Sequence, residues 1–254
     1  HAPQYPNIGL GLDKELLPWL EIYTFPEESK YGDLEYAKIV YSKLIKDLWK
    51  VGTTRAVVFN SIHKESTKLL MDMFIESGLG AYVGKVNMDR NTTKSLTEST
   101  EMSILETEEI ILEYKDKSNL VKPIITPRFV PTCSAELMEG LGNLAINYGL
   151  PVQSHLSENT SEVEWVKELH PEFTDYAFVY NEYNLFGQTN TIMAHCIYNT
   201  DEEINLMANN NVFAAHCPYS NFNLSSGIMP VRKFLDNKVP VGLGSDISGG
   251  NCLS

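Results

Sequence analysis

Residues that could do chemistry stand at the ends of short apolar runs. His155 and Glu158 close the stretch LPVQSHLSE (150–158). His195 closes TIMAHC (191–196), and Asp246 closes VPVGLGSD (239–246). Imidazole and carboxylate groups are ligands that zinc prefers, and three protein ligands plus a water form an open catalytic site. A single His or Asp in such a place is more often only hydrogen-bonded or a helix cap, so a metal site is predicted only if the fold brings these side chains together.

The sequence around these residues predicts strands that alternate with helices. The predicted strands cover residues 53–62, 80–89, 120–129, 150–158, 191–196, 212–221 and 239–246. Between them, apolar residues recur at three- and four-residue steps, as they do in amphipathic helices. The predicted helices cover residues 34–50, 64–77, 97–116, 134–148, 160–169 and 200–209. Parallel neighbours need helical crossovers, so this alternation indicates a parallel sheet that is buried on both faces.

An open doubly wound sheet and a closed barrel both fit this alternation. The polar residues favour the barrel, because Arg128, His155, His195 and Asp246 all stand at or near strand ends. In a (β/α)8 barrel those ends meet in one ring, where active sites lie. No eighth strand is found, and His1 stands where its carboxyl end is expected. We therefore expect a fragment of a longer protein, with the first barrel strand outside it.

Composition excludes several classes of protein. The chain has 254 residues, 43% of them hydrophobic, and a formal net charge of −13. A chain this acidic lacks the basic stripe that displaces counterions from nucleic acid, and no apolar run approaches the ~20 residues that span a bilayer. The four cysteines are widely spaced, which disfavours a disulfide framework and indicates a reducing, cytoplasmic compartment. The length suits a single catalytic domain over residues 1–254.

Several strings in the sequence resemble those of a known enzyme superfamily. Six strings resemble, in this order, those of the metal-dependent amidohydrolases: HAPQY (1–5), PRF (127–129), SHLSEN (154–159), MAHC (193–196), HCPYSN (216–221) and GLGSD (242–246). IYTFPEE (22–28), VGKVNMD (83–89), VKPIITPRF (121–129) and AHCPYSNFNLSSG (215–227) are similar to strings of the guanine deaminase family within it. The resemblance covers nearly the whole chain, and the combination of HAPQ with TPRF is its most specific part.

This resemblance implies a TIM-type (β/α)8 barrel, incomplete here, that holds one zinc ion per subunit. His1 matches the second histidine of an H-x-H pair whose first member would precede residue 1. His155 and Asp246 match the other two metal ligands, and His195 matches a histidine that contacts the reacting water. The resemblance also implies that the small β-sandwich domain of the family and the last barrel helix lie outside residues 1–254. The full-length protein is expected to be a cytoplasmic homodimer that binds neither nucleic acid nor membranes.

The reaction implied by the resemblance is hydrolysis of guanine to xanthine and ammonia. Glu158 is expected to take the proton of the attacking water and to deliver it to the purine ring. Proton transfer of this kind contributes roughly 10²–10⁴-fold to a rate. His195 is expected to orient the nucleophile, and Asp246 to accept a proton on its way to the leaving amine. These three residues form the predicted catalytic set.

The resemblance also implies how the base is recognised. Arg128 suits the purine carbonyl, because its planar guanidinium donates in fixed directions. Phe129 offers a ring face to the flat purine, and Gln4 offers both a donor and an acceptor to its edge. The full predicted set of substrate-contacting residues is His1, Gln4, Arg128, Phe129, His155, Glu158 and Asp246.

Two other functions stay open at this point. A different amidohydrolase could act on another purine, a pterin or a triazine, with specificity set by residues outside this chain. A barrel that has lost catalysis could serve as a binding or cytoskeletal scaffold. Such scaffolds usually lose metal ligands or the acid/base, whereas this sequence retains His155, Glu158, His195 and Asp246.

Overall fold

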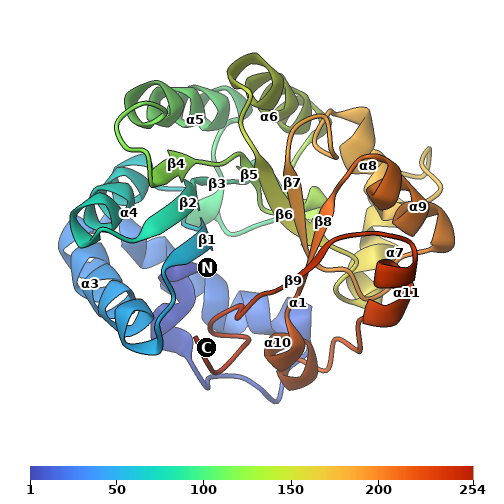
Figure 1. Cartoon of the computed structure of the whole chain (residues 1–254), viewed down its shortest axis with the longest axis horizontal. Helices are drawn as coiled ribbons and strands as arrows, with labels where there is room; N and C mark the ends of the chain where they lie inside the picture. Colours follow the sequence, from blue (N-terminus) through green and yellow to red (C-terminus); the bar gives the residue numbers. More distant parts are fainter. Residues whose placement is uncertain (254) are drawn as a thin grey trace.

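The computed structural model describes residues 1–253 and forms a ring of parallel strands enclosed by helices (Figure 1). The strands are β1 (Arg55–Phe59), β2 (Gly80–Gly84), β3 (Val86–Asn87), β4 (Val121–Pro123), β5 (Thr126–Pro127), β6 (Val152–Leu156), β7 (Thr191–His195), β8 (Phe213–His216) and β9 (Val241–Leu243). The longer helices are α3 (Leu34–Val51), α4 (Lys64–Ser77), α5 (Thr100–Tyr114), α6 (Ala135–Tyr148), α7 (Thr160–Leu169) and α9 (Asp201–Asn209). The shorter ones are α1 (Leu16–Trp19), α2 (Phe25–Glu28), α8 (Tyr176–Glu182), α10 (Pro218–Asn223) and α11 (Val231–Asp236). Each predicted helix has a counterpart, and so has each predicted strand, although the strands predicted over 80–89 and 120–129 are each divided in two, into β2 and β3 and into β4 and β5.

The strand order is that of a barrel. β1 pairs with β2 and β2 with β4, β3 pairs with β5, and β6 to β9 follow one another, always in parallel. A bridge between Ile125 and Val152 joins the β4–β5 segment to β6. The strands therefore follow chain order around the ring, without the reversal of an open doubly wound sheet. Among residues 1–253 no strand pairs with the outer edges of β1 and β9, and the described chain begins and ends on that side (Figure 1).

Two predictions about local structure need correction. The strand predicted over 212–221 ends at His216, and residues 218–223 form helix α10 instead. Pro218 explains this, because it has no backbone N–H for a strand ladder and is well suited to the first turn of a helix. The sequence predicts no element over residues 1–33, yet this segment folds into 3-10, π and one-turn α segments, including α1 and α2. One-turn helices are too short to show a helical period.

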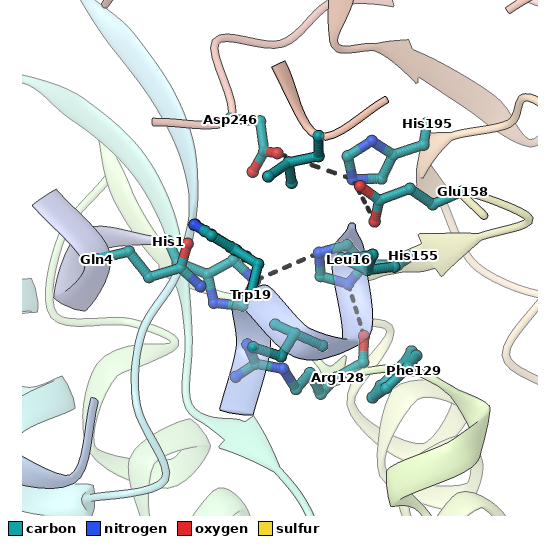
Figure 2. A pocket seen from close by; sticks show the side chains of 12 residues that line it. His1, Gln4, Leu16, Trp19, Arg128, Phe129, His155, Glu158, His195 and Asp246 are labelled. Atoms are coloured by element: carbon teal, nitrogen blue, oxygen red, sulfur yellow. Dashed lines mark hydrogen bonds and ion pairs between the residues drawn. The ribbon is translucent and has the colours of Figure 1, made fainter. Parts of the chain in front are cut away.

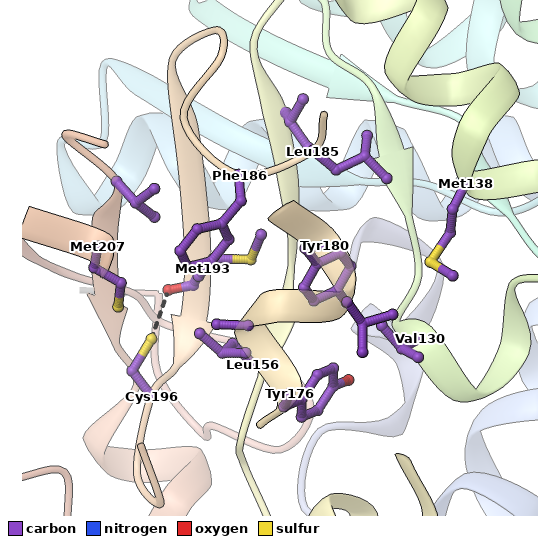
Figure 3. Packing of buried hydrophobic residues seen from close by; sticks show 14 of the residues in the cluster. Val130, Met138, Leu156, Tyr176, Tyr180, Leu185, Phe186, Met193, Cys196 and Met207 are labelled. Atoms are coloured by element: carbon purple, nitrogen blue, oxygen red, sulfur yellow. Dashed lines mark hydrogen bonds between the residues drawn. The ribbon is translucent and has the colours of Figure 1, made fainter. Parts of the chain in front are cut away.

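Two hydrophobic clusters fix the helices on the strands. In the larger cluster Tyr180 and Phe186 pack with Met193 of β7, and all three side chains are completely buried (Figure 3). The second cluster packs α3 and α4 against β1 and β2, and it includes Ala2 and Ile247 from the two ends of the described chain. Burying one large apolar side chain contributes about 1.5–3 kcal/mol. This packing holds the strand ends, and with them the polar residues that follow.

The strands also approach one another closely at Gly84, the last residue of β2. A methyl group on Gly84 would lie 2.7 Å from the carbonyl oxygen of Ile124 and would overlap the side chain of Thr126. Overpacking of this kind typically costs about 1–3 kcal/mol. We expect Gly84→Ala to lower the melting temperature by roughly 3–10 °C, measured by circular dichroism.

Gly242 in β9 provides the matched control for this substitution. Among residues 1–253, no atom outside Gly242 and its two chain neighbours lies within 4 Å of a methyl group built on Gly242. Gly242→Ala should therefore melt close to the unsubstituted chain. Equal melting temperatures for the two variants would contradict the close approach of β2 and the β4–β5 segment.

Candidate active site

One pocket opens at the carboxyl ends of the strands (Figure 2). It is lined by His1, Gln4, Leu16, Trp19, Leu20, Arg128, Phe129, His155, Glu158, His195, Leu224 and Asp246. All eight residues named from the sequence are in this set. In Figure 2 the rings of His1 and His155 face each other. The fold thus brings the predicted metal ligands, acid/base and substrate-contacting residues to one place.

His155 is held in the form that can bind a metal. It lies in β6, and its Nδ1–H donates to the backbone carbonyl of Arg128 at 2.7 Å. This bond leaves Nε2 with a free lone pair, as is usual for a metal-binding histidine. Burial, together with the neighbouring His195, lowers the pKa of His155 to about 3. The ring is therefore neutral near pH 7.

His1 and His155 are spaced like two ligands of one metal ion. Their Nε2 atoms lie 3.3 Å apart. Two nitrogens that each bind a tetrahedral zinc at 2.0–2.1 Å would lie about 3.3–3.4 Å apart. His1 Nδ1 is buried without a hydrogen bond, 3.5 Å from Oε1 of Glu28. The pair fits a metal, although no three His, Cys, Asp or Glu side chains of residues 1–253 form a complete ligand set.

His195 lies between the two pocket carboxyl groups. Its Nδ1–H donates to Oδ1 of Asn221 at 2.9 Å, and its Nε2 lies 3.3 Å from Glu158 Oε2 and 3.9 Å from Asp246 Oδ2. Burial alone would lower the pKa of His195, but Glu158 and Asp246 outweigh it and raise the pKa above its ordinary value. In turn, burial would raise the pKa of Asp246, but His195 holds it below its ordinary value.

Glu158 is a buried carboxyl group that keeps its proton to an unusually high pH. Burial raises its pKa to about 8, with Asp246 adding to the shift and His195 opposing it. The backbone N–H of Glu158 donates to Glu162 at 2.8 Å. Glu162 is the third residue of α7 and completes the capping box at the start of that helix. The start of α7 therefore fixes the backbone from which Glu158 reaches the pocket.

Three strand ends near the pocket carry residues with positive φ angles. Ser157 (φ 50°), His195 (φ 74°) and Asp246 (φ 41°) all lie in the left-handed region. A residue other than glycine costs on the order of 1–3 kcal/mol in such a conformation, which persists only where the surroundings enforce it. Strain at three strand ends around one pocket is typical of an active site.

Gln4 and Arg128 form the other wall of the pocket, and both contact a residue that the sequence did not single out. Glu28 is completely buried and accepts hydrogen bonds from Gln4 Nε2 at 2.8 Å and from Arg128 Nη1 at 2.5 Å. Glu28 ends the string IYTFPEE, so the resemblance included it without giving it a role. The apolar wall (Leu16, Trp19, Leu20 and Leu224) was also not predicted, and no pattern in the sequence marks it.

Comparison with known proteins now identifies the family. The model of the amidohydrolase family matches residues 1–254. The chain belongs to this family. Its fold is accordingly the TIM-type barrel of the amidohydrolases, as the sequence predicts.

Guanine deaminases are among the proteins to which this amidohydrolase is similar. It is 49% identical over 251 residues to guanine deaminase of Dictyostelium discoideum, with 98% of this chain and 56% of that protein covered. It is 44% identical to the human guanine deaminase, with 100% and 56% covered. The crystal structure of guanine deaminase from C. acetobutylicum with guanine bound in the active site superimposes with a TM-score of 0.98 at 61% identity, covering 99% of this chain and 60% of that one. The chain thus spans little more than half the length of these relatives.

The high pKa of Glu158 predicts how stability depends on pH in the metal-free protein. In the folded state its pKa is about 8, above the ordinary value of 4.5. Between pH 4.5 and about pH 8, Glu158 holds a proton in the folded state that it has released in the unfolded chain. The protonated, buried carboxyl group therefore contributes stability at low pH, and this contribution is lost as pH rises toward 8. Glu158→Gln cannot titrate. We therefore expect the melting temperature of Glu158→Gln, relative to wild type, to rise between pH 5 and pH 8.5.

The size of this effect follows from about 1.4 kcal/mol per pKa unit, so a few kcal/mol, or roughly 5–10 °C, is expected. The measurement is thermal unfolding of chelator-treated protein at several pH values. Glu164→Gln, at an exposed position of the same helix α7, is the control. Curves for Glu158→Gln and wild type that stay parallel across this range would contradict the buried, proton-holding carboxyl group.

Proposed function

We propose that the protein of which this chain is part hydrolyses guanine to xanthine and ammonia. The observation that supports this most directly is that one pocket joins His1, His155 and Asp246 with Glu158, Arg128 and Gln4. The similarity to a guanine deaminase that contains guanine in its active site supports the choice of substrate. No helix among the described residues is long and apolar enough to cross a membrane. A cytoplasmic location is part of the proposal, supported by the buried thiols of Cys133, Cys196 and Cys217.

In this proposal His1, His155 and Asp246 would be ligands of one zinc ion, although the described residues do not form a complete ligand set on their own. The neutral His155, the 3.3 Å spacing of the two histidine Nε2 atoms and the low pKa of Asp246 all suit a divalent cation. When bound, a zinc ion would supply the nucleophile at neutral pH, because zinc can lower the pKa of water from 15.7 to about 7.

Glu158 and its neighbours move the protons of the reaction. Glu158 takes one proton from the attacking water and passes it to the ring nitrogen beside the reacting carbon. A group with a pKa of about 8 both accepts and releases a proton near neutral pH. His195, oriented by Asn221, directs the nucleophile. Asp246 accepts the second water proton and passes it to the amino group, which leaves as ammonia, so that guanine and water become xanthine and ammonia.

The opposite wall of the pocket would recognise the purine. Arg128 keeps N–H groups beyond the one bound to Glu28, and these suit the purine carbonyl. Phe129 is packed edge-on against Trp165, with ring centroids 6.3 Å apart, and this fixes the ring plane that would cover the base. Leu16 and Trp19 of α1 would cover the remaining apolar surface.

The first test is xanthine production from guanine by the full-length protein, with zinc quantified in the same sample. We expect turnover that falls with a chelator and returns with zinc, and no turnover of adenine or cytosine. Preference for either of those bases would refute the assignment of guanine. Bound metal without guanine turnover would favour another amidohydrolase substrate, and neither metal nor turnover would favour a non-catalytic scaffold.

Glu158→Gln tests the proton transfer directly. Because Glu158 is proposed as the acid/base and not as a ligand, the variant should lose about 10²–10⁴-fold in kcat while it keeps its zinc. Steady-state kinetics and metal analysis of the same preparation measure both. Glu164→Gln on the exposed face of α7 should retain normal turnover. A normal kcat for Glu158→Gln would place the proton transfer on another group.

A further inference from the structure

Glu28 lies behind the wall of the pocket and connects two of its polar residues. It is completely buried and is not among the residues that line the pocket. Its Oε1 accepts from Gln4 Nε2 and its Oε2 accepts from Arg128 Nη1. Gln4 and Arg128 are 124 residues apart in the sequence and are only 2% and 3% exposed. One carboxylate therefore holds both side chains.

The bond to Glu28 decides which end of the Gln4 amide faces the substrate. A carboxylate oxygen accepts hydrogen bonds, so the Gln4 amide must turn its NH₂ group toward Glu28. Its Oε1 then remains as an acceptor, and no hydrogen bond within residues 1–253 uses that atom. Gln4 is therefore held as an acceptor for a substrate N–H group. Without Glu28, either end of the amide could face the pocket.

Arg128 is held on two sides by the same short helix. Glu28, the last residue of α2, binds Nη1, and Phe25, the first residue of α2, places its ring centroid 5.1 Å from the guanidinium carbon. A charge-assisted hydrogen bond and a cation–π contact together fix the plane of the guanidinium. The remaining Arg128 N–H groups then donate in fixed directions.

We propose that Glu28 is the positioning residue that sets the hydrogen-bonding pattern of the base site. It orients Arg128 as a donor and Gln4 as an acceptor, so the site selects a purine that presents a carbonyl to the first and an N–H to the second. Guanine satisfies both, whereas 2,6-diaminopurine presents an amino group in place of the carbonyl and leaves Arg128 unpaired. Sites built on such hydrogen bonds reject a mismatched analogue strongly. This inference rests on the proposed function.

The test is the variant Glu28→Gln, which keeps the shape of the side chain but adds an NH₂ group that competes with those of Gln4 and Arg128. In the full-length enzyme we expect KM for guanine to rise about tenfold or more, with kcat changed by less than about threefold. Inhibition by 2,6-diaminopurine should become stronger relative to guanine binding. Zinc content should stay at the wild-type level. Unchanged KM and unchanged discrimination would overturn the proposal, as would a kcat loss that follows loss of zinc, since that would place the effect at His1.

Glu27→Gln is the matched control. Glu27 is the preceding residue of α2 and is also buried, but it binds Tyr36 and Lys30 and does not contact the pocket. Glu27→Gln should leave KM for guanine and the discrimination between guanine and 2,6-diaminopurine at wild-type values. A KM increase in Glu27→Gln equal to that in Glu28→Gln would show a general effect of helix α2 and would overturn the specific role of Glu28.

A double-mutant cycle with Gln4→Ala separates positioning from a structural effect. If Glu28 acts partly through Gln4, the double variant should lose less kcat/KM than the product of the two single losses. Losses that multiply would overturn this coupling. If Glu28→Gln does not fold, the test uses Glu28→Asp instead. The aspartate keeps the charge beside Arg128 but is too short to bind both Gln4 and Arg128. A wild-type KM in Glu28→Asp would then overturn the proposal.

Measurements on the wild-type protein alone distinguish failure of the proposed function from failure of the proposal about Glu28. If wild type does not turn over guanine, the function is refuted, and Glu28 is tested by calorimetric binding of guanine and 2,6-diaminopurine. Equal preference between the two purines in wild type and Glu28→Gln would then overturn its positioning role. Weaker preference in the variant would support that role independently of turnover.

Discussion

The hydrogen bond from His155 Nδ1 to the backbone carbonyl of Arg128 joins the two halves of the pocket. It crosses from β6 to the residue that follows β5, and it fixes the tautomer of His155. The same Arg128 carries the guanidinium that faces the base site. A shift of the chain at residue 128 would therefore move a proposed metal ligand and a proposed recognition group together. The parallel barrel makes this possible, because it places the carboxyl ends of neighbouring strands side by side.

The residues of the pocket reduce the free energy of unfolding of the barrel. It buries several ionisable side chains, among them Glu28, Glu158 and His195, and it holds strand-end residues with positive φ. Each buried charge requires a close partner, because an isolated one would cost several kcal/mol. The two apolar clusters that pack α3, α4, α8 and α9 offset these costs away from the site. Stability and chemistry are thus supplied by different layers of the barrel, as is usual for this fold.

The sequence predicts the part of the site that belongs to regular elements. His155, His195 and Asp246 stand where apolar runs end, and a parallel barrel must bring such residues to one rim. The wall built by residues 16–28 could not be predicted in this way, because one-turn helices leave no period in the sequence. Glu28 is the clearest example of a site residue that the sequence alone could not identify. Its two partners lie 24 and 100 residues away, and only the folded barrel places the three side chains together.

The protonation states of His195, Glu158 and Asp246 depend on one another. His195 Nε2 lies 3.3 Å from Glu158 and 3.9 Å from Asp246, so a charge on any one of the three changes the proton affinity of the other two. Burial keeps a proton on Glu158 up to about pH 8, while the two carboxyl groups favour a charged His195. A cation between His1 and His155 would favour the ionised carboxyl groups, so metal binding and proton release at Glu158 are linked by the geometry of the site.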